Sequence, residues 1–351
     1  MKKITIFAWA CDFSSFRGEG ILARNFAKDI SNIKKVNIFV KTPDNNYFVS
    51  KGEIKKSKKN EKKIINFSLL ENYYWPIFGI IYLWINYFRS KKVLYLNFAP
   101  LWNFLLFYFL PPKTLIGPIT GFLPKKKIEN FSGLIRIILV PFFYRLSMFV
   151  IFKRFKSLLF STDLLSSLFL KRDHHKLYFN YLLYSNLKKK RKFVKNKKID
   201  LLIYNRNYSV KEHFKLNNLI KYLLKKGYNV SCVGDKINSI KGLKNLGILN
   251  RVKVKKILKI TKLIIASPEN PYSLFTIDAL NMGTKVLFDK KYQKKLLFLN
   301  YNSNHYINID DQNFGRIEKV ITNKSYKIYL NYKMLNSLNK KILNYLKKIV
   351  I

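Results

Sequence analysis

Arg206 and Lys211 lie five residues apart in the stretch YNRNYSVK, directly after the mostly apolar run IDLLIY. A guanidinium and an ammonium at this spacing could neutralise a diphosphate, because both donate strongly to phosphate oxygens. The apolar run predicts a strand of a parallel sheet, and ligands of such sheets bind beyond the carboxyl ends of the strands. With 67 Lys and Arg in the chain, chance placement of two basic residues is the competing interpretation.

A second pattern, SPENPYSLFTIDALNMG at 267–283, places carboxyl and amide side chains around a loop that leads into a helix. The free N–H groups at such a junction suit phosphate. Asn270 and Asp278, eight residues apart, could bind sugar and ribose hydroxyls, and Glu269 stands beside the first of them. The alternative is a capped surface helix with an acid near its positive end.

A third pattern, GEGILA at 18–23, follows the first apolar run of the chain. Gly18 and Gly20 would let backbone amides approach a ligand at a helix N-terminus. The spacing also fits a dinucleotide fingerprint, which would make the protein an oxidoreductase. Two features disfavour that alternative: the preceding turn CDFSSFR is long, and Lys41 and Thr42 stand where a ribose-binding acid is expected.

Strands and helices alternate along the chain and must position these residues. We expect strands at 2–10, 35–41, 93–98, 113–121, 199–206, 228–235, 262–267 and 284–289, and helices at 20–32, 210–227, 250–261, 271–283 and 329–351. The stretch 157–170 predicts a strand and then a helix capped by Ser161 or Thr162, with Asp163 in its first turn. The continuous apolar runs indicate parallel sheets covered on both faces.

The fold class is therefore α/β, with two doubly wound, Rossmann-like domains in tandem. The basic run at 186–198 is interpreted as a linker. It separates an N-terminal domain, 1–185, from a C-terminal domain, 199–351, which ends in an amphipathic helix.

These patterns, in this order, resemble the family-four-like glycosyltransferases of the GT-B fold. The Gly-rich loop RGEGILARNFA matches, and so does the pair Arg206 and Lys211, although Asn205 stands where the family has glycine. Gly234 and Asp235 match a Gly-Asp pair after the next strand, and IGPITG at 116–121 is similar to a further segment of some members. NPYSLFTIDALNMG aligns with a motif of two glutamates and places Asn270 and Asp278 at their positions.

The resemblance implies transfer of a hexose from a nucleotide-sugar donor, held mainly by the second domain, to a glycan or lipid-linked acceptor at the first. It implies a retaining enzyme without metal or cofactor, acting in cell-surface polysaccharide or lipopolysaccharide synthesis. Arg206 and Lys211 would neutralise the donor diphosphate and support the leaving group. The residues implied to bind the donor are Gly18, Gly20, Gly234, Asp235, Glu269, Asn270, Pro271, Tyr272, Ser273, Leu274 and Asp278. Because Asn205 and Asn270 depart from the motifs, a catalytically degenerate binding protein is the main alternative.

The net charge of +48 would attract polyanions or an anionic membrane, unless it reflects a general enrichment in Lys, Asn, Ile, Phe and Tyr. Nucleic acid is not the expected partner, because the aromatic residues fall in apolar runs rather than among the basic ones. The two cysteines, far apart in the chain, suit a cytoplasmic location.

Two apolar stretches, 93–112 and 134–152, approach the length of a membrane span. The first contains Pro100 and reads as a strand and a short buried helix. The second carries Arg136 and Arg145 and reads as two amphipathic helices broken at Pro141. We therefore expect no span, and peripheral binding at the inner face of the plasma membrane.

Overall fold

A computed structural model describes residues 4–15, 18–33, 36–57, 71–96, 99–121, 131–187, 197–206, 216–237, 240–293, 295–299, 306–308, 314–323 and 330–350. Its contacts divide the chain into two compact units. The first comprises Met1–Ser185 with Asn339–Ile351, and the second comprises Asn186–Leu338.

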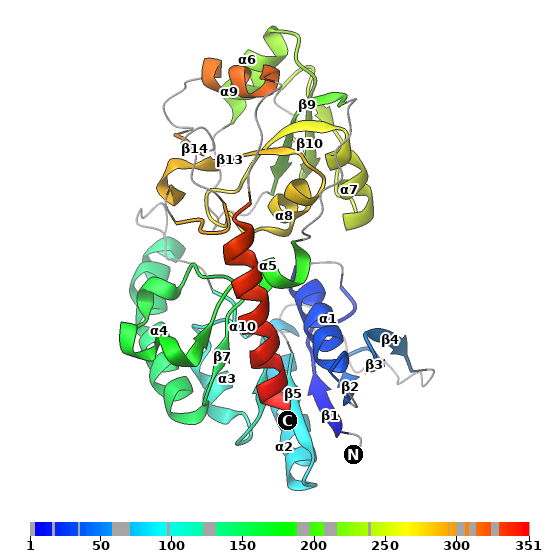
Figure 1. Ribbon diagram of the computed structural model, residues 1–351, viewed down its shortest axis with the longest axis vertical. Helices are drawn as coiled ribbons and strands as arrows, with labels where there is room; N and C mark the ends of the chain where they lie inside the picture. The colour runs from blue at the N-terminus through cyan, green and yellow to red at the C-terminus, as the bar shows by residue number, and fades with distance from the viewer. Residues whose placement is uncertain are drawn as a thin grey trace. The chain divides into compact units, whose positions relative to one another are not determined.

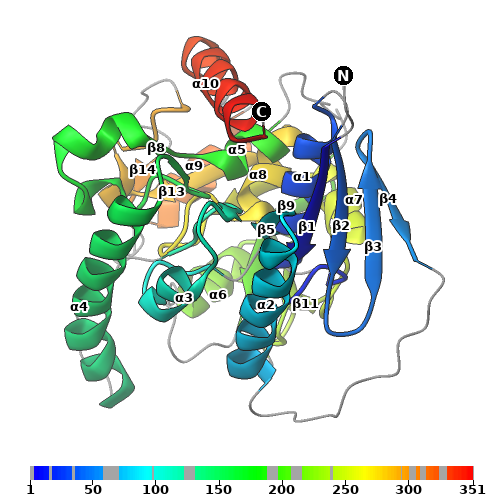
Figure 2. The same ribbon diagram turned by 90° about the horizontal axis from the view of Figure 1, so that it is seen from below.

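The first unit is built on a six-stranded sheet in the order β4-β3-β2-β1-β5-β6 (Figure 2). The pairs β1–β2, β1–β5 and β5–β6 are parallel, whereas β2–β3 and β3–β4 are antiparallel. Exposed charges on β4 protect the edge of the sheet from further pairing. The strands are β1 (Ile4–Trp9), β2 (Val36–Lys41), β3 (Asn46–Ser50), β4 (Glu53–Lys56), β5 (Lys92–Tyr95) and β6 (Leu115–Ile116).

Helices α1 (Gly18–Ser31) and α2 (Glu71–Phe88) lead from β1 to β2 and from the β2–β4 strands back to β5. These crossovers run in opposite directions along the sheet, so right-handed connections place the two helices on opposite faces. On the α2 face, α3 (Phe104–Phe109) and α4 (Phe131–Arg154) complete a core that includes Trp9, Tyr95 and Phe107. The sequence did not predict α2.

Helix α4 continues through Pro141, so the predicted break into two helices is wrong. Proline removes one backbone donor from a helix interior, at a cost of about 3 kcal/mol. Burial of Tyr144 and Ile151 on the same helix offsets that cost.

In the stretch 157–170 the predicted strand is confirmed as β7 (Leu158–Leu159), but a 3₁₀ turn at Ser166–Leu168 replaces the predicted α-helix. Asp163 does not serve as a first-turn acid of an α-helix. Its carboxylate accepts from Asn180 Nδ2, and its N–H donates to Asn180 Oδ1, both at 2.9 Å. This pairing ties the segment to the loop after β8 (Leu177–Tyr178), ahead of α5 (Tyr181–Asn186).

The second unit contains a sheet in the order β11-β10-β9-β12-β13-β14, with every pair parallel. Its strands are β9 (Ile199–Asn205), β10 (Val230–Gly234), β11 (Lys244–Asn245), β12 (Thr261–Ile265), β13 (Lys285–Asp289) and β14 (Tyr306–Ile307). Helices α6 (Asn217–Lys225) and α9 (Phe314–Thr322) pack together on one face, and α7 (Arg251–Lys259) and α8 (Leu274–Asn281) lie on the other (Figure 1). The predicted strands and helices of this half are confirmed, although the described part of α6 begins later than expected.

The C-terminal helix α10 (Tyr332–Val350) was predicted to belong wholly to the second domain, but Asn339–Ile351 belongs to the first unit. Ile342, Leu346 and Val350 are buried there, and the Tyr345 ring lies 4.6 Å from that of Tyr178. Lys92 at the start of β5 also donates to the Val350 carbonyl at 2.8 Å. The apolar stripe of α10 therefore stabilises the first unit.

Among the described residues, no helix is both long and apolar enough to cross a bilayer.

Candidate functional site

The carboxyl edge of the second sheet gathers most of the predicted site residues. The chain passes from β9 to β10 on one side and later returns to β12 on the other side of β9. Ligands of doubly wound sheets bind where the strand order reverses in this way. Three segments meet at this edge: Asn205–Arg206 at the end of β9, Gly234–Asp235 at the end of β10, and the loop 266–273 after β12.

The first two segments are joined by reciprocal hydrogen bonds. The Asp235 N–H donates to the Asn205 carbonyl, and Asn205 Nδ2 donates to the Asp235 carbonyl, both at 3.0 Å. Gly234 has φ +104°, and a Cβ there would lie 2.0 Å from the Asn205 oxygen, so only glycine fits. The Asn205 side chain thus ties two strand ends together. Half-buried Arg206 follows directly, and Lys211 lies outside the described residues.

The loop after β12 is held by its own contacts. Asn270 Oδ1 accepts from the Tyr272 N–H at 2.9 Å, and the Tyr292 hydroxyl donates to the carbonyls of Pro268 and Glu269. Tyr272 is 1% exposed, and the Pro271 side chain is buried as well. These side chains build the loop rather than face a ligand. The Glu269 side chain is half-buried, and its carboxylate has no partner within the described ranges.

Ser273 caps α8, because its Oγ accepts from the Thr276 N–H at 3.2 Å. Leu274, the first helical residue, is half-buried. Phe275 stacks on Tyr204, with ring centroids 5.4 Å apart and planes at 27°. Tyr204 is 45% exposed and precedes Asn205. This aromatic pair, which presents a flat surface beside the loops, was not predicted from the sequence.

Asp278 is placed differently from its predicted role as a ribose ligand. Its side chain is 2% exposed, and Arg251 binds both carboxylate oxygens, at 2.6 and 2.8 Å. Lys255 adds a third contact at 3.4 Å. A ribose ligand needs a free acceptor, whereas this carboxylate links α8 to α7. Arg251 also donates to Asn186 at 3.1 Å.

In the first unit, Gly18 begins α1 and is exposed, whereas Gly20 is buried. A Cβ on Gly20 would lie 2.5 Å from the Asp12 oxygen and 2.6 Å from the Ser15 oxygen. Arg24 also donates to the Phe13 carbonyl from within α1. The small residue at Gly20 is thus required by close packing of the chain on itself.

The carboxyl ends of β1 and β5 bring Cys11 and Tyr95 together, with the sulfur 3.6 Å from the phenolic oxygen. Burial raises the pKa of the Cys11 thiol to about 11, so the thiol stays protonated at neutral pH. This environment does not favour thiolate nucleophilic chemistry.

In the part of the chain that the structure describes, no three His, Cys, Asp or Glu side chains gather as metal ligands.

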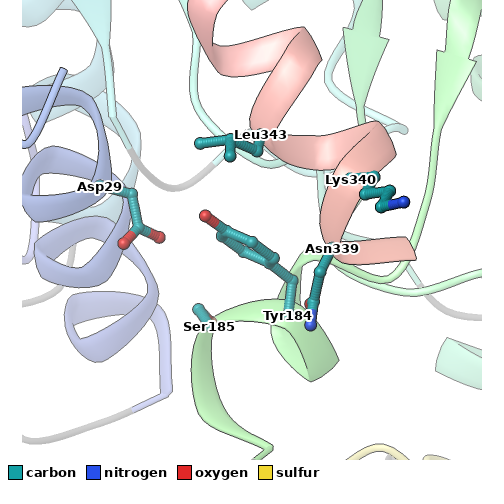
Figure 3. Close-up of a pocket in the computed structure, with 6 residues that line it drawn as sticks. All are labelled: Asp29, Tyr184, Ser185, Asn339, Lys340 and Leu343. Atoms are coloured by element: carbon teal, nitrogen blue, oxygen red, sulfur yellow. The ribbon is translucent and has the colours of Figure 1, made fainter. Parts of the chain in front are cut away.

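A pocket of about 410 Å³ in the first unit is lined by Asp29 of α1, Tyr184 and Ser185 of α5, and Asn339, Lys340 and Leu343 of α10 (Figure 3). The Tyr184 ring points into the space between the helices, and the Lys340 amine points away from it. The Tyr181 hydroxyl donates to Asp29 at 2.5 Å. Burial raises the pKa of Asp29 to about 6. None of the predicted site residues lines this pocket.

Comparison with known proteins gives matches among solved structures. No family model matches the chain, and neither does any curated protein sequence. The Anabaena protein HepE, in complex with UDP and glucose, matches with a TM-score of 0.50 at 11% identity, over 98% of this chain and 99% of that one. The chain has the GT-B fold.

Two further structures match at lower TM-scores. They are Staphylococcus aureus MnaA with UDP (TM-score 0.47, 14% identity, 97% of this chain and 91% of that one) and T4 phage β-glucosyltransferase (0.46, 11%, 99% of both). The predicted α/β architecture of two Rossmann-like domains is confirmed. At 11% identity the match to HepE establishes the fold alone.

Proposed function

We propose that this protein is a glycosyltransferase that moves a sugar from a nucleotide-sugar donor to an acceptor. The observation that carries the proposal is the convergence of Arg206, Gly234–Asp235 and Glu269–Ser273 at the point where the strand order of the second sheet reverses. In a GT-B chain, the loops at this edge supply a cation from Arg206, a backbone that a ligand can approach closely at Gly234, and a carboxylate from Glu269. The binding of UDP by HepE, a protein of the same fold, supports the nucleotide part of the proposal.

Arg206 and Lys211 are assigned to the leaving group. When the bond between the sugar carbon and the phosphate oxygen breaks, both bonding electrons stay with the diphosphate, and negative charge builds there. A guanidinium and an ammonium stabilise that charge without a metal, so we propose metal-independent transfer. The retaining outcome remains a proposal from the sequence resemblance.

Glu269 is assigned to the sugar hydroxyls, because its carboxylate has no partner among the described residues and stands beside Asn270, the residue aligned with the first glutamate of the family motif. The stacked Tyr204 and Phe275 offer an apolar plane for the nucleobase. We further propose a hexose as the transferred sugar and a glycan or lipid-linked acceptor, in the synthesis of a surface polysaccharide or lipopolysaccharide.

The second candidate function is donor binding without turnover. It is favoured by the engagement of Asn205, Asn270 and Asp278 in internal contacts, which leaves fewer groups for a donor than the family pattern has. The two candidates differ in turnover alone.

A thermal-shift screen of the purified protein with UDP-, GDP-, ADP- and CMP-sugars tests both, because any ligand of the native state raises its apparent stability. Hydrolysis or transfer of the stabilising donor then separates an enzyme from a binding protein. Arg206→Ala and Lys211→Ala should each cost about 2–4 kcal/mol of transition-state stabilisation without unfolding the protein. If no nucleotide sugar stabilises the wild type, the donor-site proposal fails.

A further inference from the structure

Three helices of the first unit expose large apolar side chains to solvent. Helix α2 exposes Ile77, Phe78, Ile81, Ile85 and Phe88, with Phe88 at 75%. Helix α3 exposes Leu105, Tyr108 and Phe109, each above half. Helix α4 exposes Ile138, Leu139, Phe142 and Phe149. These twelve residues, here called the apolar face, are more than half of the 21 large apolar side chains that the described structure exposes. Such concentration marks an interaction surface rather than scattered exposure.

The three helices are neighbours, with α3 between α2 and α4 (Figures 1 and 2). Trp84 of α2 donates to the Phe109 carbonyl at 2.8 Å. Phe104 of α3 stacks on Phe143 of α4 at 5.7 Å, and Arg154 of α4 donates to the Phe107 carbonyl at 2.6 Å. The exposed residues are therefore carried by one fixed group of helices.

The exposed residues form stripes along the two longer helices. Ile77, Ile81, Ile85 and Phe88 recur at helical spacing on α2, and the opposite side of that helix buries Leu83. On α4, Ile138, Phe142 and Phe149 share a stripe with exposed Arg145 and Lys153. The spacing of three, four and seven residues keeps these side chains on one side of each helix. Each helix thus has one buried and one solvent-facing apolar stripe.

Basic residues accompany the apolar face. Exposed Arg89, Lys113, Arg145, Lys153 and Lys156 lie on or directly after these helices. The sequences of α3 and α4 contain no Asp or Glu, and that of α2 contains one, Glu71. Lys153 Nζ lies 4.2 Å from the centroid of the Phe149 ring, so its charge sits beside an apolar side chain. Aromatic and aliphatic residues mixed with Lys and Arg are typical of helices that lie in an anionic lipid interface.

We propose that the apolar face of α2, α3 and α4 docks on an anionic lipid bilayer. Its exposed Phe and Ile side chains enter the boundary between headgroups and acyl chains, and the adjacent Arg and Lys contact lipid phosphates. A second copy of this chain is a poorer occupant, because the same basic residues would face one another across a symmetric interface. Docking is separate from glycosyl transfer, since it requires neither donor nor acceptor.

Flotation with vesicles of phosphatidylglycerol and phosphatidylcholine tests the proposal, with phosphatidylcholine alone as the reference. The full-length protein should float with anionic vesicles at roughly 20 mM salt and be released in part at roughly 500 mM, because screening weakens the basic contacts. The triple variant Ile81→Ser, Phe109→Ser, Phe142→Ser should bind at least about tenfold more weakly. Arg145→Gln with Lys153→Gln should lose roughly 30-fold at low salt.

Matched controls come from the second unit. Ile248→Ser, Val252→Ser, Leu297→Ser removes three apolar residues that are more exposed than those of the test variant, and Lys225→Gln with Lys241→Gln removes two exposed charges. Both controls should bind vesicles as the wild type does. If the controls lose as much vesicle binding as the test variants, binding does not depend on the apolar face, and the proposal is overturned. A second result would also overturn it. Sedimentation equilibrium would show that the wild type is a dimer, the triple Ser variant would be a monomer, and the wild-type dimer would not bind vesicles.

Discussion

Asp278 of α8 and Arg251 of α7 form a buried charged pair, in which the Asp278 side chain is 2% and the Arg251 side chain 21% exposed. Removing one partner of a buried pair leaves an uncompensated charge. Loss of one partner of a buried ion pair usually costs about 3–5 kcal/mol. Because Arg251 retains some contact with water, Asp278→Asn should lower the free energy of unfolding by somewhat less, about 2–4 kcal/mol. Urea denaturation measures this loss, and the exposed Glu53→Gln should show almost none.

The same variant decides between two roles of Asp278. If the carboxylate is structural, nucleotide affinity measured by calorimetry on the folded variant should equal that of the wild type. Weakened nucleotide binding with intact stability would instead restore the ribose role that the sequence suggested.

Glu269 has the opposite profile, because its carboxylate is half-buried and has no partner within the described part of the chain. Glu269→Gln should leave stability unchanged and weaken binding of the intact nucleotide sugar by about 1.5–3 kcal/mol. Binding of the bare nucleotide should be unaffected, since only the sugar is contacted. Calorimetric titration with both ligands distinguishes these effects. Asn270→Ala serves as the comparison, because it removes the acceptor of the Tyr272 N–H and should destabilise the loop.

At the residue scale, most of the second-unit residues singled out in the sequence lie at one sheet edge, because the carboxyl ends of parallel strands meet there. It could not show that Asp278 is paired. Arg251 is 27 residues away and is one of 67 basic residues, so nothing in the local pattern marks it. The stacking of Tyr204 could not be predicted for a similar reason, since its partner Phe275 belongs to another element.

At the element scale, the contact between α1 and α5 contains an ionisable group with a pH-dependent effect. Burial raises the pKa of Asp29 to about 6, while Tyr181 donates to its carboxylate. The folded state therefore holds this proton more tightly than the unfolded state. Stability should fall as pH rises from about 4 to 6, by at most about 3 kcal/mol, and partial exposure to solvent should lower that figure.

Asp29→Asn removes this titration but still accepts from Tyr181. It should match the wild type near pH 4 and be more stable above pH 6, as measured by urea denaturation across this range. The exposed Asp44→Asn provides the control, and its profile should follow the wild type. A variant less stable than the wild type at pH 8 would mean that the charged carboxylate is stabilising.

Elements with continuous apolar runs were predictable, whereas those determined by distant contacts were not. The strands β9, β10, β12 and β13 follow directly from their sequences. The α-helix predicted around Asp163 was wrong, because the conformation there depends on a contact with Asn180, which follows β8. The helix break predicted at Pro141 was wrong because the proline's cost to the helix is local, and burial of other residues on the same helix outweighs it.

At the scale of the whole molecule, the alternation of strands and helices was enough to predict two Rossmann-like units. It was not enough to assign α10 to a unit. An amphipathic period shows that one face is buried, but it does not show against which element. The contacts of Tyr345 with Tyr178, and of Val350 with Lys92, assign the last turns to the first unit.

The net charge of +48 also has a consequence for the whole chain, since 67 basic residues face only 19 acidic ones. Most basic residues must therefore repel one another without a compensating acid, and this self-repulsion destabilises the compact state. Raising salt from roughly 10 to 150 mM shortens the range of that repulsion from about 30 to 8 Å. The same change weakens surface pairs such as Lys55–Glu53, but these contribute little. The Tm measured in potassium chloride should therefore rise over this range. A Tm that falls with salt would mean that attractive pairs outweigh the repulsion, despite the excess of basic residues.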